Sequence, residues 1–352
     1  MGEILLVLSP HRLEFLPRAF ELMEECETVI LEEPRHPEFE ALLSGKTALT
    51  KFLEISEPGF PEYSRAVYQK MRELFSRGRQ VLQVEPYLEG VQKIQARLAA
   101  GEEPEALQRD PELSPIYQHE HQTFGRLLDF YAALSEPFES LVEKIKAFAQ
   151  ADAARLIFRD TLRAQALRQI LKGLSGQRVY LETGYIHLYL VRELARKPPA
   201  GFRLRVRNLV RLATGGHLPR GLWPAPGDVL TAFYLFEKRR AVEEDLLAAR
   251  SLVYIRLIEK NELQPSPENP FPHLRDEVFF RAFVRGLSFE DCRRLDARIR
   301  LLPTAEARQV AQKSFPEIWK QASQLVDQVF REVKTSGGLR AGLSRSLTPG
   351  RG

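Results

Sequence analysis

The chain of 352 residues has few cysteines and no long hydrophobic run. Its two cysteines, Cys26 and Cys292, exclude a disulfide framework and lack the paired spacing of a zinc finger. No apolar stretch approaches the ~20 residues that a membrane-spanning helix needs. The N-terminus enters an apolar run at once, without the basic segment of a secretory signal peptide. We therefore expect a cytoplasmic protein without a membrane span.

Several signatures of common protein classes are also absent. The sequence has no glycine-rich phosphate loop, no Gly-x-Ser-x-Gly nucleophile motif and no internal repeat. The net charge of +4 is not a basic surface signal, because three of the four charges come from arginines in the acid-free segment 335–352. The remainder of the chain is close to neutral, which argues against nucleic acid as a partner.

Four short apolar runs predict buried strands, over residues 4–8, 28–31, 80–84 and 178–181. Apolar residues at helical spacing lie between the first two runs, over residues 12–25. A strand, a helix and a second strand in this order favour parallel pairing with a right-handed crossover. The sequence therefore predicts an α/β fold with a central, largely parallel sheet and helices on its faces.

Composition divides the chain into three expected parts. Residues 1–195 form an α/β core with a helical insertion over about 86–176, interrupted by a loop over 101–115. Residues 196–334 form a mainly helical C-terminal region, and 335–352 a disordered basic tail. In the C-terminal region we expect one long helix over 228–260 and two or three helices over 275–333. They would cover one face of the sheet or form a homo-oligomer surface.

Residues 202–207 alternate apolar and basic side chains and predict an edge or fifth strand. Arg203, Arg205 and Arg207 would share one face of this strand. Basic residues on an edge strand prevent edge-to-edge pairing, and they are also able to bind phosphate or nucleic acid. No stacking aromatics alternate with these arginines, so we favour the interpretation that they prevent edge-to-edge pairing. A nucleic-acid or anion adaptor that uses residues 203–211 stays as a third functional hypothesis.

A histidine or a carboxylate follows each of the four predicted strands. The candidates are His11, Glu32, Glu33, Glu85 and His187. The carboxyl ends of parallel strands meet at one edge of a sheet, where open α/β sheets bind ligands. The sequence therefore predicts one shared crevice. Each candidate could instead be a helix cap, a loop residue or a structural histidine. Glu182, directly after the fourth predicted strand, is favoured as structural.

A long helix is predicted over 138–174, where no proline occurs. Its apolar stripe also carries Asp152, Arg159, Asp160 and Arg163. Charges inside an apolar stripe are rare unless they are paired or line a cavity. Two interpretations remain open. In the first, the charges are structural: they form a buried ion-pair network, or the helix breaks near Asp152 and turns its later part outward. In the second, this face turns toward the strand ends and brings Arg159 and Asp160 into the crevice.

Four short motifs follow one another along these expected elements. Two lie where a strand runs into a histidine, one where a strand ends in a carboxylate, and one is an Arg-Asp pair inside the long helix. They are Leu8-Ser9-Pro10-His11, Val29-Ile30-Leu31-Glu32, Arg159-Asp160 and Gly184-Tyr185-Ile186-His187. In this order they resemble the TraB/Tiki group of the ChaN and erythromycin-esterase superfamily, over about residues 3–195.

The resemblance implies a hydrolase of the peptidase or esterase type, which is metal-dependent in some members, and its relatives include a haem-binding lipoprotein. The family's first motif is Gly-x-x-His, so Leu8 stands where the family has glycine. This leucine brings a side chain to a place where glycine would let the backbone approach its neighbours closely. It is the feature that favours a binding protein over an active enzyme.

The candidate residues support two kinds of chemistry. His11, His187 and Glu32 could ligate a divalent metal (zinc, manganese or cobalt) with a position left for water, and Glu33 or Glu85 would act as general base on that water. Without a metal, the two histidines would transfer protons directly, while Arg159 of the Arg159-Asp160 pair holds an oxyanion.

Our leading hypothesis is a hydrolase with an unknown small-molecule or peptide substrate. The alternative is a non-catalytic protein that binds a small, haem-like ligand in the same crevice.

Overall fold

The computed structural model describes residues 1–219, 222, 224–237 and 241–335. It contains a five-stranded, all-parallel sheet with the order β3-β2-β4-β1-β5, which confirms the predicted α/β fold. The strands are β1 (Gly2–Ser9), β2 (Thr28–Leu31), β3 (Gln80–Gln83), β4 (Arg178–Gly184) and β5 (Phe202–Asn208). The tail expected to be disordered lies, from residue 336 on, outside the described residues.

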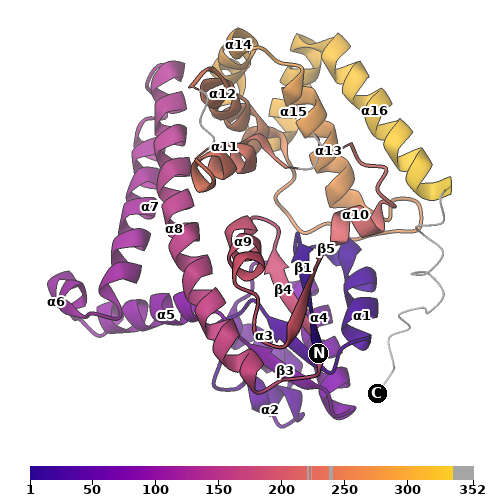
Figure 1. Cartoon of the computed structure of the whole chain (residues 1–352). Coiled ribbons are helices and arrows are strands. Elements are labelled where there is room, and N and C mark those ends of the chain that lie inside the picture. The colour runs from indigo at the N-terminus through magenta and orange to yellow at the C-terminus, as the bar shows by residue number, and fades with distance from the viewer. Residues whose placement is uncertain (220–221, 223, 238–240, 336–352) are drawn as a thin grey trace.

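Helices cover the sheet and follow it along the chain (Figure 1). The first group is α1 (Leu16–Glu24), α2 (Phe39–Leu43), α3 (Leu49–Ser56), α4 (Pro61–Ser76), α5 (Pro86–Ala99), α6 (Pro104–Arg109), α7 (Ser114–Ala132) and α8 (Phe138–Lys172). The second group is α9 (Leu188–Arg196), α10 (Leu209–Ala213), α11 (Pro226–Leu235), α12 (Ala241–Leu257), α13 (Pro272–Arg285), α14 (Phe289–Ile299), α15 (Thr304–Ser314) and α16 (Pro316–Thr335).

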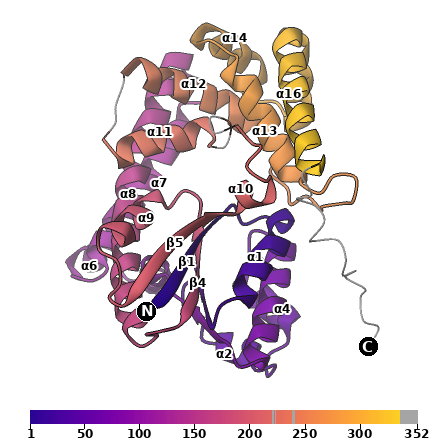
Figure 2. The same cartoon turned by 45° about the vertical axis from the view of Figure 1, so that its right-hand side comes forward.

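Both faces of the sheet are buried, which explains why its strands read as continuous apolar runs. Leu5 and Val7 of β1 point to one face and pack with α1 to α4, while Ile4 and Leu6 point to the other and pack with α9 and the C-terminal half of α8. Figure 2 shows the sheet between these two helical layers. β5 pairs only with β1, so it is an edge strand, as its sequence predicts.

α8 connects the sheet to the C-terminal helices. It is one unbroken helix of 35 residues, as predicted, and it does not break near Asp152. Its N-terminal half packs against α7, α11 and α12, and its C-terminal half packs on the sheet (Figure 1). α11 lies over the carboxyl edge of the sheet, where it lines a pocket together with the ends of β1 and β5.

Three local predictions were wrong. The expected loop over 101–115 contains α6, which Pro104 begins at a position where its missing N–H costs nothing. The single helix expected over 228–260 is two helices, since Glu237 adopts a left-handed φ of 54° just after α11. Four helices, not two or three, cover 272–335. Across the described residues, no helix combines the length and the apolar character needed to cross a bilayer.

Candidate functional site

Three predicted site residues converge at the end of β4. A Cβ atom placed on Gly184 would lie 3.3 Å from Cδ2 of His187, 3.6 Å from Oε2 of Glu32 and 3.6 Å from Cε1 of His11. These residues follow β4, β2 and β1, which are adjacent strands in the sheet. The carboxyl edge therefore gathers residues that are far apart in the sequence, and a glycine at position 184 leaves room for their side chains.

His187 lies between two carboxylates. Its Nε2 is 2.8 Å from Oε1 of Glu32, and its Nδ1 is 2.5 Å from Oδ1 of Asp160. The second oxygen of Asp160 accepts the backbone N–H of Leu190 in α9. Burial alone would lower the pKa of His187, but the charges of Glu32 and Asp160 outweigh burial and raise it to about 9. At neutral pH the ring is therefore an imidazolium that donates from both nitrogens.

Glu32 is held by cations on its other sides. Its Oε1 lies 3.0 Å from Nη2 of Arg159, and its Oε2 lies 3.1 Å from Nη1 of Arg163. Oε2 also accepts the backbone N–H of Gly184 at 2.5 Å. Burial would raise the pKa of Glu32, but His187 and the two arginines hold it well below its usual range. Glu32 is therefore ionised.

Arg163 joins the ends of β3 and β4 from within the structure. Its side chain is fully buried, and it donates from Nε to the carbonyl of Val84 at 2.9 Å and from Nη2 to the carbonyl of Glu182 at 2.8 Å. Glu85, equally buried, has Oε2 3.4 Å from Nη2 of Arg159 and 3.6 Å from Nε of Arg163.

Together these groups form what we call the ion cluster, in which three acids balance three cations. Its members are Glu32, Glu85, Asp160, Arg159, Arg163 and His187. Both interpretations of the charged stripe on α8 therefore hold in part. The stripe is a buried ion-pair network, and it also faces the strand ends.

A second polar group, on the α4 side of the sheet edge, contains Glu33 and Glu182. Glu33 accepts hydrogen bonds from Oη of Tyr68 at 3.1 Å and from Nε2 of Gln83 at 2.8 Å. Burial, and then the nearby charge of Glu182, raise the pKa of Glu33 to about 7. Glu32 and Glu33 are consecutive, so they project to opposite sides of the strand end, and their pKa values move in opposite directions.

His11 belongs to this second group. Its Nε2 lies 3.6 Å from Oε1 of Glu182, which accepts a hydrogen bond from Oη of Tyr63 at 3.0 Å. Among the described residues, Nε2 of His11 has no hydrogen-bond partner, although the side chain is 34% exposed. The backbone of His11 adopts a φ of 51°, a left-handed conformation that is strained for a residue with a side chain and is typical of functional sites.

The residues predicted as metal ligands do not fit a metal ion in this arrangement. Both ring nitrogens of His187 face carboxylates, and Glu32 is bound by two arginines and a backbone N–H. A cation would have to displace these partners and face Arg159 and Arg163. Within the part of the chain that the structure describes, no group of three or more His, Cys, Asp or Glu side chains could hold a metal.

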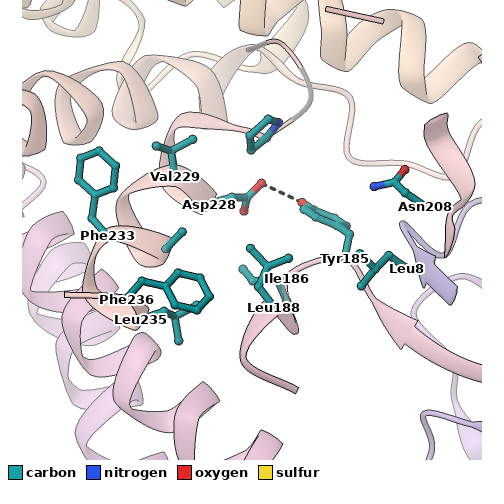
Figure 3. A pocket seen from close by; sticks show the side chains of 12 residues that line it. Leu8, Tyr185, Ile186, Leu188, Asn208, Asp228, Val229, Phe233, Leu235 and Phe236 are labelled. Carbon is teal, nitrogen blue, oxygen red and sulfur yellow. Dashed lines mark hydrogen bonds between the residues drawn. The ribbon is translucent and has the colours of Figure 1, made fainter. Parts of the chain in front are cut away.

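An apolar pocket of about 380 Å³ adjoins this edge of the sheet (Figure 3). It lies between the ends of β1, β4 and β5 and helix α11. Its lining includes Leu8, Ile186, Leu188, Val229, Ala232, Phe233 and Phe236. Tyr185 also lines it and donates a hydrogen bond from Oη to Oδ2 of Asp228 at 3.0 Å. Leu8, the first residue of the Leu8-Ser9-Pro10-His11 stretch, is therefore part of a pocket wall.

Three site residues were not assigned a site role from sequence. Arg163 is one helical turn after Arg159, so the stripe on α8 could have identified it. Glu182 was taken as structural, yet it faces both His11 and Tyr63. Tyr63 gave no signal, because only the packing of α4 brings it near. Arg205, on the edge strand, pairs with Glu3 at 2.7 Å.

Comparison with known proteins adds one relative. A protein of Archaeoglobus fulgidus, described as an uncharacterized protein, is 28% identical over 287 residues, which cover 81% of this chain and 93% of that protein. No family model matches the chain. No solved structure matches it either. The resemblance to the TraB/Tiki group therefore stays a prediction.

Proposed function

We propose that the protein is a hydrolase in which His11 is the general base. One observation carries this proposal: His11 is partly exposed at the carboxyl edge, on a strained backbone, with Nε2 3.6 Å from Oε1 of Glu182. His187 is unsuited to the same role, because both of its nitrogens are paired and its pKa of about 9 keeps it protonated.

Glu182 would orient the base. Oε1 of Glu182 lies 3.6 Å from Nε2, which is longer than a hydrogen bond, but its negative charge would favour the tautomer that carries the proton on Nε2. That tautomer leaves Nδ1 to accept a proton from water. Tyr63 holds the same carboxylate oxygen through its hydroxyl group. Glu182 and Tyr63 are thus positioning residues, and His11 is the group that would contact the attacking water.

The proposed reaction is hydrolysis of an ester or amide. Water gives a proton to His11, and its oxygen bonds to the carbonyl carbon. The bond from that carbon to the leaving oxygen or nitrogen then breaks, and the leaving group takes a proton. Glu33 is a suited donor, because its pKa of about 7 keeps much of it protonated near neutrality. Arg159 would stabilise the oxyanion; its Nε has no hydrogen-bond partner among the described residues.

The test is turnover of a panel of chromogenic esters and fluorogenic peptides by the full chain. We expect His11→Ala to lower kcat/KM about 100-fold to 10,000-fold, the usual contribution of a general base. His217→Ala is a matched control, since that side chain is 35% exposed and lies 3.6 Å from Glu332, much as His11 lies from Glu182. Equal rates in His11→Ala and the unaltered protein would overturn the assignment of the base.

A second candidate function is supported by the apolar pocket. A protein that binds a small ligand at this edge without turnover would also need a pocket wall such as Leu8 provides. Saturable binding of an apolar ligand, with no hydrolysis of any substrate in the panel, would favour this function over the hydrolase.

A further inference from the structure

We infer that the substrate carries a medium-length acyl chain, held in the apolar pocket of Figure 3. This inference rests on the hydrolase proposed above and names its substrate class. The pocket and the polar site share one short stretch of chain, the turn from Gly184 to His187. Tyr185 and Ile186 of this turn line the pocket, whereas His187 faces the ion cluster.

The end of β1 connects the pocket to the proposed base. Leu8 lines the pocket and is three residues before His11. Its neighbour across the sheet is Asn208 of β5, which also lines the pocket. An acyl group that enters along these strand ends would bring its carbonyl carbon toward the edge where His11 stands.

Helix α11 supplies the opposite wall with an apolar face that the core does not use. Leu230 and Tyr234 of α11 are buried against the other helices. Val229, Ala232 and Phe233 lie on the other side of the helix and line the pocket, as does Phe236 just after the helix; Figure 3 shows Val229, Phe233 and Phe236 there. A helix that is apolar on both faces is expected where one face packs in the core and the other meets an apolar ligand.

Size and polarity both favour an acyl chain. A cavity of about 150 Å³ accepts a benzene ring, so a pocket of about 380 Å³ holds a considerably larger apolar group. The carboxylate of Asp228 accepts hydrogen bonds from Oη of Tyr185 and from the backbone N–H of Ala225, both at 3.0 Å. The pocket thus opposes an anionic ligand group, which would lose its hydration there without gaining a partner.

The experiment compares p-nitrophenyl esters of acetate, butyrate, hexanoate, octanoate and decanoate, together with calorimetric binding of decanoate. For the unaltered chain, we expect kcat/KM to rise about fourfold with each added methylene until the pocket is full. Ala232→Trp fills the pocket and should lower the ratio of decanoyl to acetyl turnover at least tenfold. Phe233→Ala removes part of the wall and should lower the same ratio without adding bulk. Ala297→Trp, at an exposed position of α14, is the matched control.

The possible outcomes separate the two proposals. The acyl site would be overturned, and the hydrolase retained, if kcat/KM did not depend on chain length. In that case Ala232→Trp and Phe233→Ala would have the same ratio of decanoyl to acetyl turnover as the unaltered chain. Decanoate binding that Ala232→Trp abolishes, without turnover of any ester or of the fluorogenic peptides, would overturn the hydrolase and support an acyl-binding protein. Neither binding nor turnover would overturn both.

Discussion

Nε2 of His187 lies 2.8 Å from Oε1 of Glu32, so the turn after β4 is joined to the end of β2 by an ion pair. Both side chains are nearly inaccessible to solvent. A buried ion pair of this kind is stable only when its remaining polar atoms are satisfied, and here Asp160, Arg159 and Arg163 satisfy them. The pair therefore makes the geometry of the edge depend on the protonation of one histidine.

The first prediction concerns the pH dependence of stability. The pKa of His187 is about 9 in the folded protein and 6.5 ordinarily. The folded state retains a proton that the unfolded chain has lost, so the stabilisation is complete below pH 6.5 and disappears as the pH rises through 9. We expect the free energy of unfolding to fall by on the order of 3 kcal/mol across this window.

Urea unfolding between pH 6 and pH 10 measures this fall. His187→Gln should remove it, because glutamine does not titrate, and His217→Gln should retain it. The same slope in His187→Gln as in the unaltered protein would show that another group is responsible.

The second prediction concerns Glu33, whose pKa is raised from 4.5 to about 7. The folded state keeps this proton between pH 4.5 and pH 7 while the unfolded chain releases it, so stability falls as the pH rises through that window. Glu33→Gln removes this loss. As the pH rises from 4.5 to 8, the free energy of unfolding of the variant, relative to that of the unaltered protein, should increase by on the order of 3 kcal/mol. Glu40→Gln, at an exposed position of α2, should show no such gain.

The third prediction concerns the buried Arg163. Arg163→Met leaves Glu32 and Glu85 with one cation fewer and removes the donors to Val84 and Glu182. We expect it to lower the free energy of unfolding by about 3–5 kcal/mol, the usual cost of breaking a buried pair. Denaturant unfolding measures this change.

Arg168→Met is the matched control on the same helix. Arg168 is 24% exposed, and we expect its substitution to cost about 1 kcal/mol or less. Adding Glu85→Gln to Arg163→Met should recover part of the loss, because it removes a buried acid that has lost one of its two cations. A similar loss in the free energy of unfolding for Arg163→Met and Arg168→Met would contradict the conclusion that Arg163 is the more important of the two for stability.

The fourth prediction concerns metal removal. Since the nitrogens of His187 and the oxygens of Glu32 are already paired, we expect a chelator to leave Tm unchanged. Elemental analysis and thermal unfolding before and after chelation check this. Loss of a stoichiometric divalent ion together with a lower Tm, abolished in His187→Ala, would support the metal site predicted from sequence instead.

Local patterns were sufficient to predict the strands and the long helix. The four apolar runs correspond to β1 to β4, and the proline-free segment corresponds to α8. Periodicity was less reliable in the C-terminal region, where one predicted helix is two. There the end of α11 depends on the left-handed conformation of Glu237, which carries no strong signature in a residue other than glycine.

The sequence alone determined which residues follow the strands, and therefore that His11, Glu32, Glu85 and His187 occupy one edge, because all parallel strands end there. Only the tertiary structure decided that β4 lies between β1 and β2. That order brings Glu32 to one side of His187 and leaves His11 beside Glu182, while the packing of α8 brings Asp160 to the other side of His187. The two histidines differ in their partners, and partners across the sheet are set by packing between distant segments, which no local pattern records.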